Sequence, residues 1–142
     1  MMEKFRDIIK QERQKIRAVL SQYLENEKNI LFAYLHGSFA EGRPFRDIDI
    51  AVFVKESKIP REKALDFEMS ISLKLEKIIK MSVDVKVINY APLGFQYHST
   101  GGILLVCRDD DLRVDFLTKM RSLYFDFKPS SERFLMEMLD AE

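Results

Sequence analysis

The chain has few of the residues that build disulfide frameworks or metal clusters. Its 142 residues include one cysteine, two histidines and no tryptophan, and Lys+Arg and Asp+Glu are equal at 23 each. The lone Cys107 excludes an internal disulfide, fits a reducing cytosol and, within an apolar run, indicates a buried structural thiol. With only His36 and His98, structural roles are favoured over a zinc site or a Ser-His triad. Balanced charge disfavours strong, sequence-independent binding to nucleic acid.

The sequence also lacks an apolar run long enough to span a bilayer, and its first residues lack the apolar core of a signal peptide. We therefore expect a cytoplasmic protein without a membrane partner. Apolar residues make up 46% and charged residues 32%, which is typical of a globular domain. At this length we expect one domain, with an N-terminal helix (3–25), a catalytic core (29–90) and a C-terminal helical segment (92–142).

Apolar periodicity predicts helices that alternate with strands. The expected strands are 30–35, 47–54, 83–88 and 103–107. The expected helices are 3–25, 38–42, 60–80, 92–101, one from Asp109 or Asp110 to about Phe125, and a last one capped by Ser130 or Ser131. These elements predict an α+β fold in which helices pack on a small mixed β-sheet.

One stretch carries the chemistry: a Gly37-Ser38 turn followed closely by Asp47 and Asp49 at the head of an apolar strand. Side chains two residues apart along a strand project from the same face, so we expect both carboxylates on one face. Aspartate is disfavoured in strands and like charges repel, but a divalent cation between them turns this cost into a binding site. The alternative is a solvated edge strand, although residues 50–54, apolar on both faces, favour a central one.

Asp84 adds a third carboxylate, on the polar face of the strand expected at 83–88. If this strand lies beside the strand at 47–54, Asp84 comes near Asp49, and a pair of magnesium ions with bound phosphates needs such a third acid. The alternative role of Asp84 is an ion pair with Lys86 on the same face. Spacing alone does not decide between the two.

The Gly37-Ser38 turn is suited to phosphate. Glycine permits close approach of the backbone, and Ser38 offers an N–H and a hydroxyl at the start of a helix. Ser38 with Glu41 three residues later also fits a capping box, and the two interpretations are compatible.

Together these features resemble the minimal nucleotidyltransferase (MNT) family of the DNA polymerase β-like superfamily, whose prokaryotic members are usually antitoxins of HEPN-domain ribonucleases. The residues that carry the resemblance are Gly37, Ser38, Gly42, Asp47, Asp49 and Asp84. It extends to the C-terminal helix and so covers most of the chain, and it implies the polymerase β palm-like nucleotidyltransferase fold. No arginine precedes a histidine at the spacing of the HEPN ribonuclease signature, so the chain resembles the antitoxin and not the toxin.

The resemblance implies a magnesium-dependent transferase that moves AMP from ATP to a protein hydroxyl on a HEPN toxin encoded nearby, in an oligomer of this chain alone or with the toxin. It implies the following roles: two Mg²⁺ ions on Asp47, Asp49 and Asp84, acceptor deprotonation assisted by Asp84, and the β- and γ-phosphates on Gly37 and Ser38. Arg43 or Arg46 would add positive charge for the phosphates, or else be a solvated loop arginine. The rival hypotheses are a non-catalytic module that neutralises its partner by masking it, and a nucleotidyltransferase that acts on a small molecule.

Overall fold

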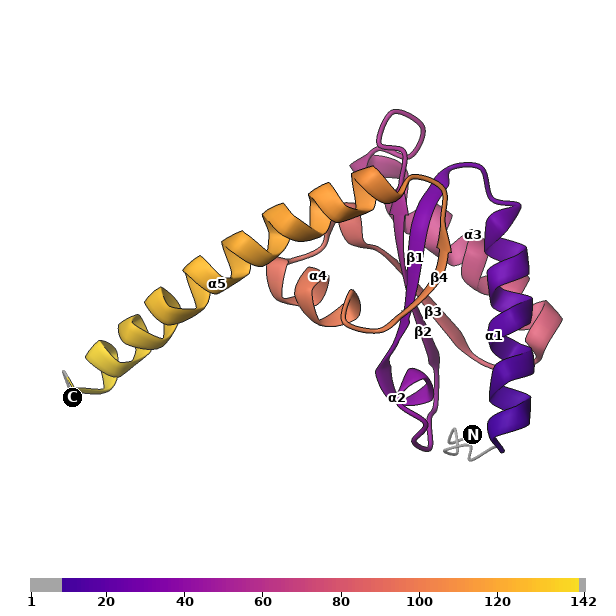
Figure 1. The fold of residues 1–142 in the computed structure, drawn as a ribbon, viewed down its shortest axis with the longest axis horizontal. Coiled ribbons are helices and arrows are strands. Elements are labelled where there is room, and N and C mark those ends of the chain that lie inside the picture. Colours follow the sequence, from indigo (N-terminus) through magenta and orange to yellow (C-terminus); the bar gives the residue numbers. More distant parts are fainter. Residues whose placement is uncertain (1–8, 141–142) are drawn as a thin grey trace.

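The structure is a computed structural model and describes residues 9–140. Its elements are α1 (Lys10–Glu25), β1 (Ile30–His36), α2 (Gly37–Ala40), β2 (Ile48–Val54), α3 (Arg61–Ile79), β3 (Val83–Val87), the 3-10 turn η1 (Ile88–Tyr90), α4 (Leu93–Ser99), β4 (Ile103–Cys107) and α5 (Asp110–Asp140). The strands form one mixed sheet in the order β3-β2-β1-β4, in which only β2 and β3 run parallel (Figure 1). This arrangement confirms the predicted α+β fold.

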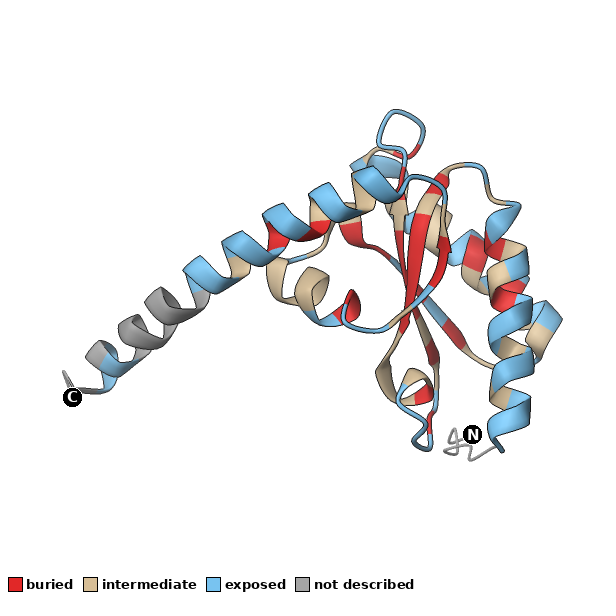
Figure 2. Ribbon diagram, in the orientation of Figure 1, coloured by how far each residue is buried: buried red, intermediate tan, exposed pale blue. Residues whose placement is uncertain are grey.

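Alternation along the strands gives the sheet two different faces. The larger core lies between the sheet and helices α1 and α3, where Ile50 and Val85 pack with Leu20, Leu24 and Leu75. The opposite face is aromatic and is covered by α4 and α5. Its residues are Phe32, Tyr34, Ala51 and Ile88, packed against Phe53, Phe95, Leu112 and Phe116 among others. Burial is concentrated in the sheet, while the far part of α5 extends away from it (Figure 2).

Helix α3 also closes the outer edge of β3. Three of its side chains, each four residues apart and so on one stripe of the helix, accept backbone N–H groups of the strand. The pairs are Val83 with Glu76 (3.0 Å), Val85 with Ser72 (3.2 Å) and Val87 with Glu68 (2.8 Å). An unpaired strand edge is a template for pairing with other chains, so these contacts both stabilise β3 and block that pairing.

Two details at helix starts differ from expectation. Pro60 is the N-cap of α3 and not its first helical residue. The prediction of a capping box formed by Ser38 and Glu41 is wrong. Helix α2 begins at Gly37, its N-cap is the extended residue His36, and no side chain caps it. The expected start of the first helix within 3–8 lies outside the described residues, and the described helix begins at Lys10.

The two helices predicted for the C-terminal segment form a single helix, α5. Asp109 caps α5 as expected, because its Oδ1 accepts the Leu112 N–H (3.0 Å). The helix then continues through Pro129 to Asp140, so the expected break before Ser130 is wrong. Proline removes one hydrogen bond from a helix, and here the helix continues past that position. In the described part of the chain, no helix combines the length and apolar character needed to cross a bilayer.

The contact between α3 and β3 generates a stability prediction. Replacing Ser72 by alanine leaves the Val85 N–H without its partner, so we expect the free energy of unfolding to fall by about 1 kcal/mol relative to a Ser70→Ala control. Ser70 is exposed on the same helix, so both changes gain the same helix propensity. Urea denaturation measures the difference. Equal stabilities would show that the edge contact contributes nothing.

Candidate functional site

Acidic side chains gather at one end of the sheet, on the face covered by α4 and α5. Asp49 and Asp84 are direct neighbours in the parallel pair of β2 and β3. His36 lies opposite Asp49 in the antiparallel pair of β1 and β2. The adjacency on which the predicted site depends is therefore present. The alternative ion pair of Asp84 with Lys86 is not among the ion pairs formed within residues 9–140.

Asp47 reaches this end of the sheet from a bend and not from the strand. Strand β2 begins at Ile48, so the expectation that Asp47 and Asp49 share one strand is wrong. Asp47 Oδ1 accepts a hydrogen bond from the Ser82 hydroxyl (2.5 Å), and the Ile48 N–H donates to the Ser82 carbonyl (2.9 Å). These two contacts hold the bend against the segment that leads into β3.

The electrostatics of the cluster are unfavourable in the protein alone. Burial raises the pKa of Asp49 to about 6, and the negative charges of Asp84 and Asp47 contribute further to the increase. Burial lowers the pKa of His36, although the nearby Asp84 acts in the opposite direction. An imidazole that remains neutral does not compensate the carboxylates. A cation is therefore the chemical complement of this cluster.

The Gly37 turn faces the same carboxylates. Gly37 has a φ of +78°, and a Cβ placed on it would collide with Asp49 Oδ2. Glycine satisfies both constraints at this position. Ser38 follows within α2 and is half-buried, and its hydroxyl forms no hydrogen bond with the residues that the structure describes. The turn thus brings backbone close to Asp49, and the Ser38 hydroxyl follows one residue later.

The two candidate arginines lie in the loop between α2 and β2. Arg43 is exposed and forms an ion pair with Glu41 (2.7 Å). Arg46 is exposed one residue before Asp47. Neither lines the cavity described next. Of the predicted residues, the fold brings together Gly37, Asp47, Asp49 and Asp84, and of these four only Gly37 lines that cavity.

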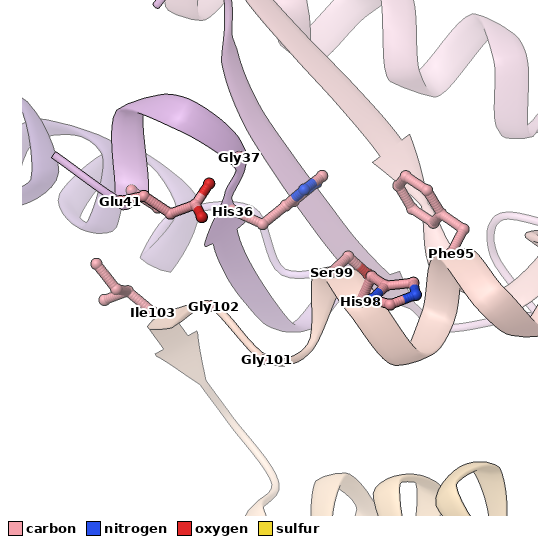
Figure 3. A pocket seen from close by; sticks show the side chains of 10 residues that line it. His36, Gly37, Glu41, Phe95, His98, Ser99, Gly101, Gly102 and Ile103 are labelled. Carbon is pink, nitrogen blue, oxygen red and sulfur yellow. The ribbon is translucent and has the colours of Figure 1, made fainter. Parts of the chain in front are cut away.

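A cavity of about 540 Å³ opens beside Gly37 (Figure 3). His36, Gly37 and Glu41 lie on one side of it, whereas the other side comes from α4 and the loop into β4. The residues of that second side are Phe95, His98, Ser99, Gly101, Gly102 and Ile103. The His36 ring packs edge-on against Phe95, with 5.4 Å between ring centres. The volume is in the range of small-molecule sites.

The sequence contains only weak signs of these cavity walls. His36 stands directly before Gly37, and this position is the only sign that it belongs to the site. Gly101 and Gly102 indicate a helix end and nothing more, yet a Cβ on Gly102 would collide with the Leu35 carbonyl. The glycine therefore lets the loop approach β1 closely. His36 and the α4 residues were absent from the predicted site because only packing places them there.

The carboxylates fit a divalent cation when a phosphate ligand is counted with them. Within residues 9–140, no three His, Cys, Asp or Glu side chains already form a metal-binding group. Magnesium in nucleotide enzymes takes one or two carboxylates and completes its coordination with phosphate oxygens and water. Asp49 and Asp84, next to a turn that can approach phosphate, match this requirement.

The chain matches a known family over most of its length. Residues 18–111 match the family described as polymerase beta, nucleotidyltransferase, and this range includes the turn, the three aspartates and both sides of the cavity. No curated protein matches the chain in sequence.

Solved structures with a similar fold come from toxin–antitoxin complexes. A complex of the tri-AMPylated Shewanella oneidensis HEPN toxin with its MNT antitoxin matches at 18% identity, with 89% of this chain and 98% of that chain covered and a TM-score of 0.68. The toxin–antitoxin MntA–HepT matches at 18% identity, 89% and 98% coverage and a TM-score of 0.67. A toxin–antitoxin with AMP-PNP matches at 20% identity, 87% and 98% coverage and a TM-score of 0.67. At these identities the likeness establishes the fold.

The raised pKa of Asp49 generates a prediction about stability and pH. The pKa of about 6 in the folded protein exceeds the ordinary value of 3.8, so the folded state binds more protons than the unfolded state between about pH 4 and 6. The free energy of unfolding therefore falls as pH rises through this range. In the absence of divalent cations, we expect Asp49→Asn to melt about 3 °C or more above the wild type at pH 7, and to lose this advantage near pH 4.

Asp66→Asn on α3 is the control for this measurement, because Asp66 is exposed and far from the cluster in sequence. Its melting temperature should differ from that of the wild type by the same small amount at both pH values. An Asp49→Asn variant that is less stable than the wild type at pH 7 would contradict the repulsion among the carboxylates.

Proposed function

This chain belongs to the polymerase β nucleotidyltransferase family, and on that premise we propose that it transfers AMP from ATP to a protein hydroxyl in a magnesium-dependent reaction. The acceptor we propose is a HEPN-domain toxin, which the chain neutralises as its antitoxin. One observation carries the proposal: Asp49 and Asp84 stand side by side on neighbouring strands, Asp49 faces Gly37, and Gly37 lines a cavity of about 540 Å³.

In this proposal the nucleotide spans the turn and the cavity. Gly37 and Ser38 hold the β- and γ-phosphates with backbone N–H groups and the free hydroxyl, and Arg43 and Arg46 add positive charge from the next loop. The nucleoside lies between the turn and α4, where Phe95 contributes an aromatic surface. The cavity of about 540 Å³ lies in the size range of small-molecule sites.

The chemistry follows from where each carboxylate lies. Bound Mg²⁺, held by Asp47, Asp49 and Asp84, would neutralise phosphate charge and orient the reacting groups. The acceptor oxygen forms a bond to the α-phosphorus as the bond from that phosphorus to the bridging oxygen breaks, and pyrophosphate leaves. The hydroxyl proton passes to Asp84, which is exposed on the edge strand β3, whereas Asp49 is half-buried on the central strand. Positioning and charge neutralisation then supply most of the rate.

Two observations support a protein as the acceptor. One structural neighbour contains a tri-AMPylated HEPN toxin bound to its MNT antitoxin. In addition, α5 extends from the body of this chain and exposes large apolar side chains, including Leu123, Phe125 and Phe127 (Figure 2). Leu123 and Phe127 are four residues apart and so lie on the same side of the helix, and exposed apolar patches are typical of surfaces that bind other proteins.

Transfer of labelled AMP tests the proposal directly. We expect ATP labelled at the α-phosphate to label the HEPN protein encoded by the neighbouring gene when Mg²⁺ is present, and to leave it unlabelled in EDTA. The double change Asp47→Asn with Asp49→Asn should reduce the rate roughly 100-fold or more, because charge stabilisation is lost at the reacting phosphate. Gel autoradiography or intact-protein mass spectrometry measures the product.

The control for this experiment is Asp66→Asn, which removes an exposed acid from α3 and should leave the rate unchanged. Normal transfer by the double variant would disprove the assignment of the site. Absence of label from the wild type, while it still binds the toxin tightly, would favour neutralisation by masking. Label on a small-molecule hydroxyl and not on the toxin would favour the small-molecule rival.

Binding of the nucleotide is tested separately from transfer. We expect ATP with Mg²⁺ to raise the melting temperature of the wild type, because a ligand that binds only the folded state stabilises it. Magnesium without ATP should raise the melting temperature by a smaller amount, because the phosphates of ATP complete the coordination of the ion. The variant with Asp47→Asn and Asp49→Asn should show no magnesium-dependent part of this shift. An identical shift in both proteins would place the metal elsewhere.

A further inference from the structure

One side chain of α1 contacts the loop behind the Gly37 turn. Arg13 Nη1 donates to the Phe39 carbonyl (2.8 Å), and Nη2 donates to the Arg43 carbonyl (2.9 Å). The guanidinium also lies over the rings of Phe39 and Phe45, at 5.2 and 5.4 Å from their centres. A single arginine therefore holds three residues of the segment that separates Gly37 from Asp47.

The segment from 37 to 47 has little structure of its own. Its only helix, α2, is a single turn, and a helix this short is not stable by itself. Its internal backbone hydrogen bonds run from residues 41, 42 and 43 back to 37, 39 and 38, at 3.1, 3.2 and 3.0 Å. Both of its ends enter the candidate site, at the Gly37 turn and at Asp47.

The other end of the contact is helix α1, which packs against the sheet. Helix α1 is anchored in the larger core by Leu20 and Leu24, which are both fully buried. Phe39 and Phe45 are also buried and pack edge-to-face, with 4.9 Å between ring centres, so the guanidinium rests on a fixed aromatic pair. Its planar fork reaches two carbonyls at once, which a lysine ammonium does not do in the same geometry.

We propose that Arg13 is a positioning residue of the nucleotide site, which holds the segment from 37 to 47 so that Gly37 and Ser38 face the carboxylates before nucleotide binds. This inference rests on the proposed function for the identity of the ligand. The tether itself does not, because both of its hydrogen bonds are formed between residues of this chain. Holding a loop in its binding conformation strengthens binding by removing the cost of ordering it.

Hydrogen exchange tests the tether without nucleotide. In Arg13→Ala we expect the backbone amides of residues 41–43 to exchange roughly tenfold faster than in an Arg17→Ala control, because two hydrogen bonds and the ring contacts are lost. Arg17 lies one turn further along α1, is exposed and forms no hydrogen bond, ion pair or ring contact with the residues that the structure describes. Equal exchange in the two variants would overturn the inference.

Nucleotide affinity tests the link to the site. We expect the Kd for ATP with Mg²⁺ and the KM for ATP to rise about tenfold in Arg13→Ala, with kcat at saturating ATP within about twofold of the wild type, because Arg13 orders the site and does not touch the reacting atoms. The Kd and KM of Arg13→Lys should lie between those of the wild type and those of Arg13→Ala, because lysine retains the charge but lacks the planar guanidinium that reaches two carbonyls. If Arg13→Ala has the same Kd as Arg17→Ala, the role of Arg13 is purely structural, even if the melting temperature of Arg13→Ala is lower.

The two possible failures give different results. A wild-type protein that does not bind ATP with Mg²⁺ would overturn the proposed function, and with it the nucleotide role of Arg13. The exchange measurement would still decide whether Arg13 holds the segment. Normal nucleotide binding by both wild type and Arg13→Ala would leave the proposed function standing and overturn this inference alone.

Discussion

The parallel pairing of β2 with β3 places Asp49 beside Asp84. Their two negative charges repel each other, and the rest of the site is arranged around this pair. The register that brings them together is set by the other face of the sheet, where Ile50 and Val85 pack in the larger core. A slip of one residue would turn these apolar side chains toward the wrong face, so the core enforces the proximity of the acids. The free energy of the core therefore sustains a cluster that is unfavourable by itself.

Each part of the site is held by contacts from a segment outside it. The ladder from α3 to the edge of β3 holds the strand that carries Asp84, and Ser82 holds the bend that carries Asp47. On the other side, α1 reaches the segment behind Gly37 through Arg13. These supports explain how a short turn and a bend, both weak elements alone, maintain a defined geometry opposite the strands. Rigid placement of this kind is what a site acting through position and charge requires.

The aromatic face of the sheet connects the site to the surface expected to meet a partner. Helix α4 forms one side of the cavity through Phe95 and His98, and it is tied to α5 where Tyr97 stacks on Tyr124 with ring centres 3.9 Å apart. Phe116, near the start of α5, packs on the sheet, whereas Phe125 further along is exposed. The aromatic residues of this helix are thus divided between the core and the exposed surface. The helix with the exposed apolar side chains therefore packs directly against the helix that forms one side of the cavity.

By itself, the sequence determined the strands, the glycine turn and the spacing of acids around Ile48, because side-chain periodicity and backbone preferences are local. It also allowed the family to be recognised from the turn and the aspartates. Only the tertiary structure decided that Asp47 precedes its strand, that α5 does not break at Pro129, and that His36, α4 and Arg13 belong around the site. These outcomes depend on contacts between segments far apart in the chain, and no pattern within a single segment encodes them.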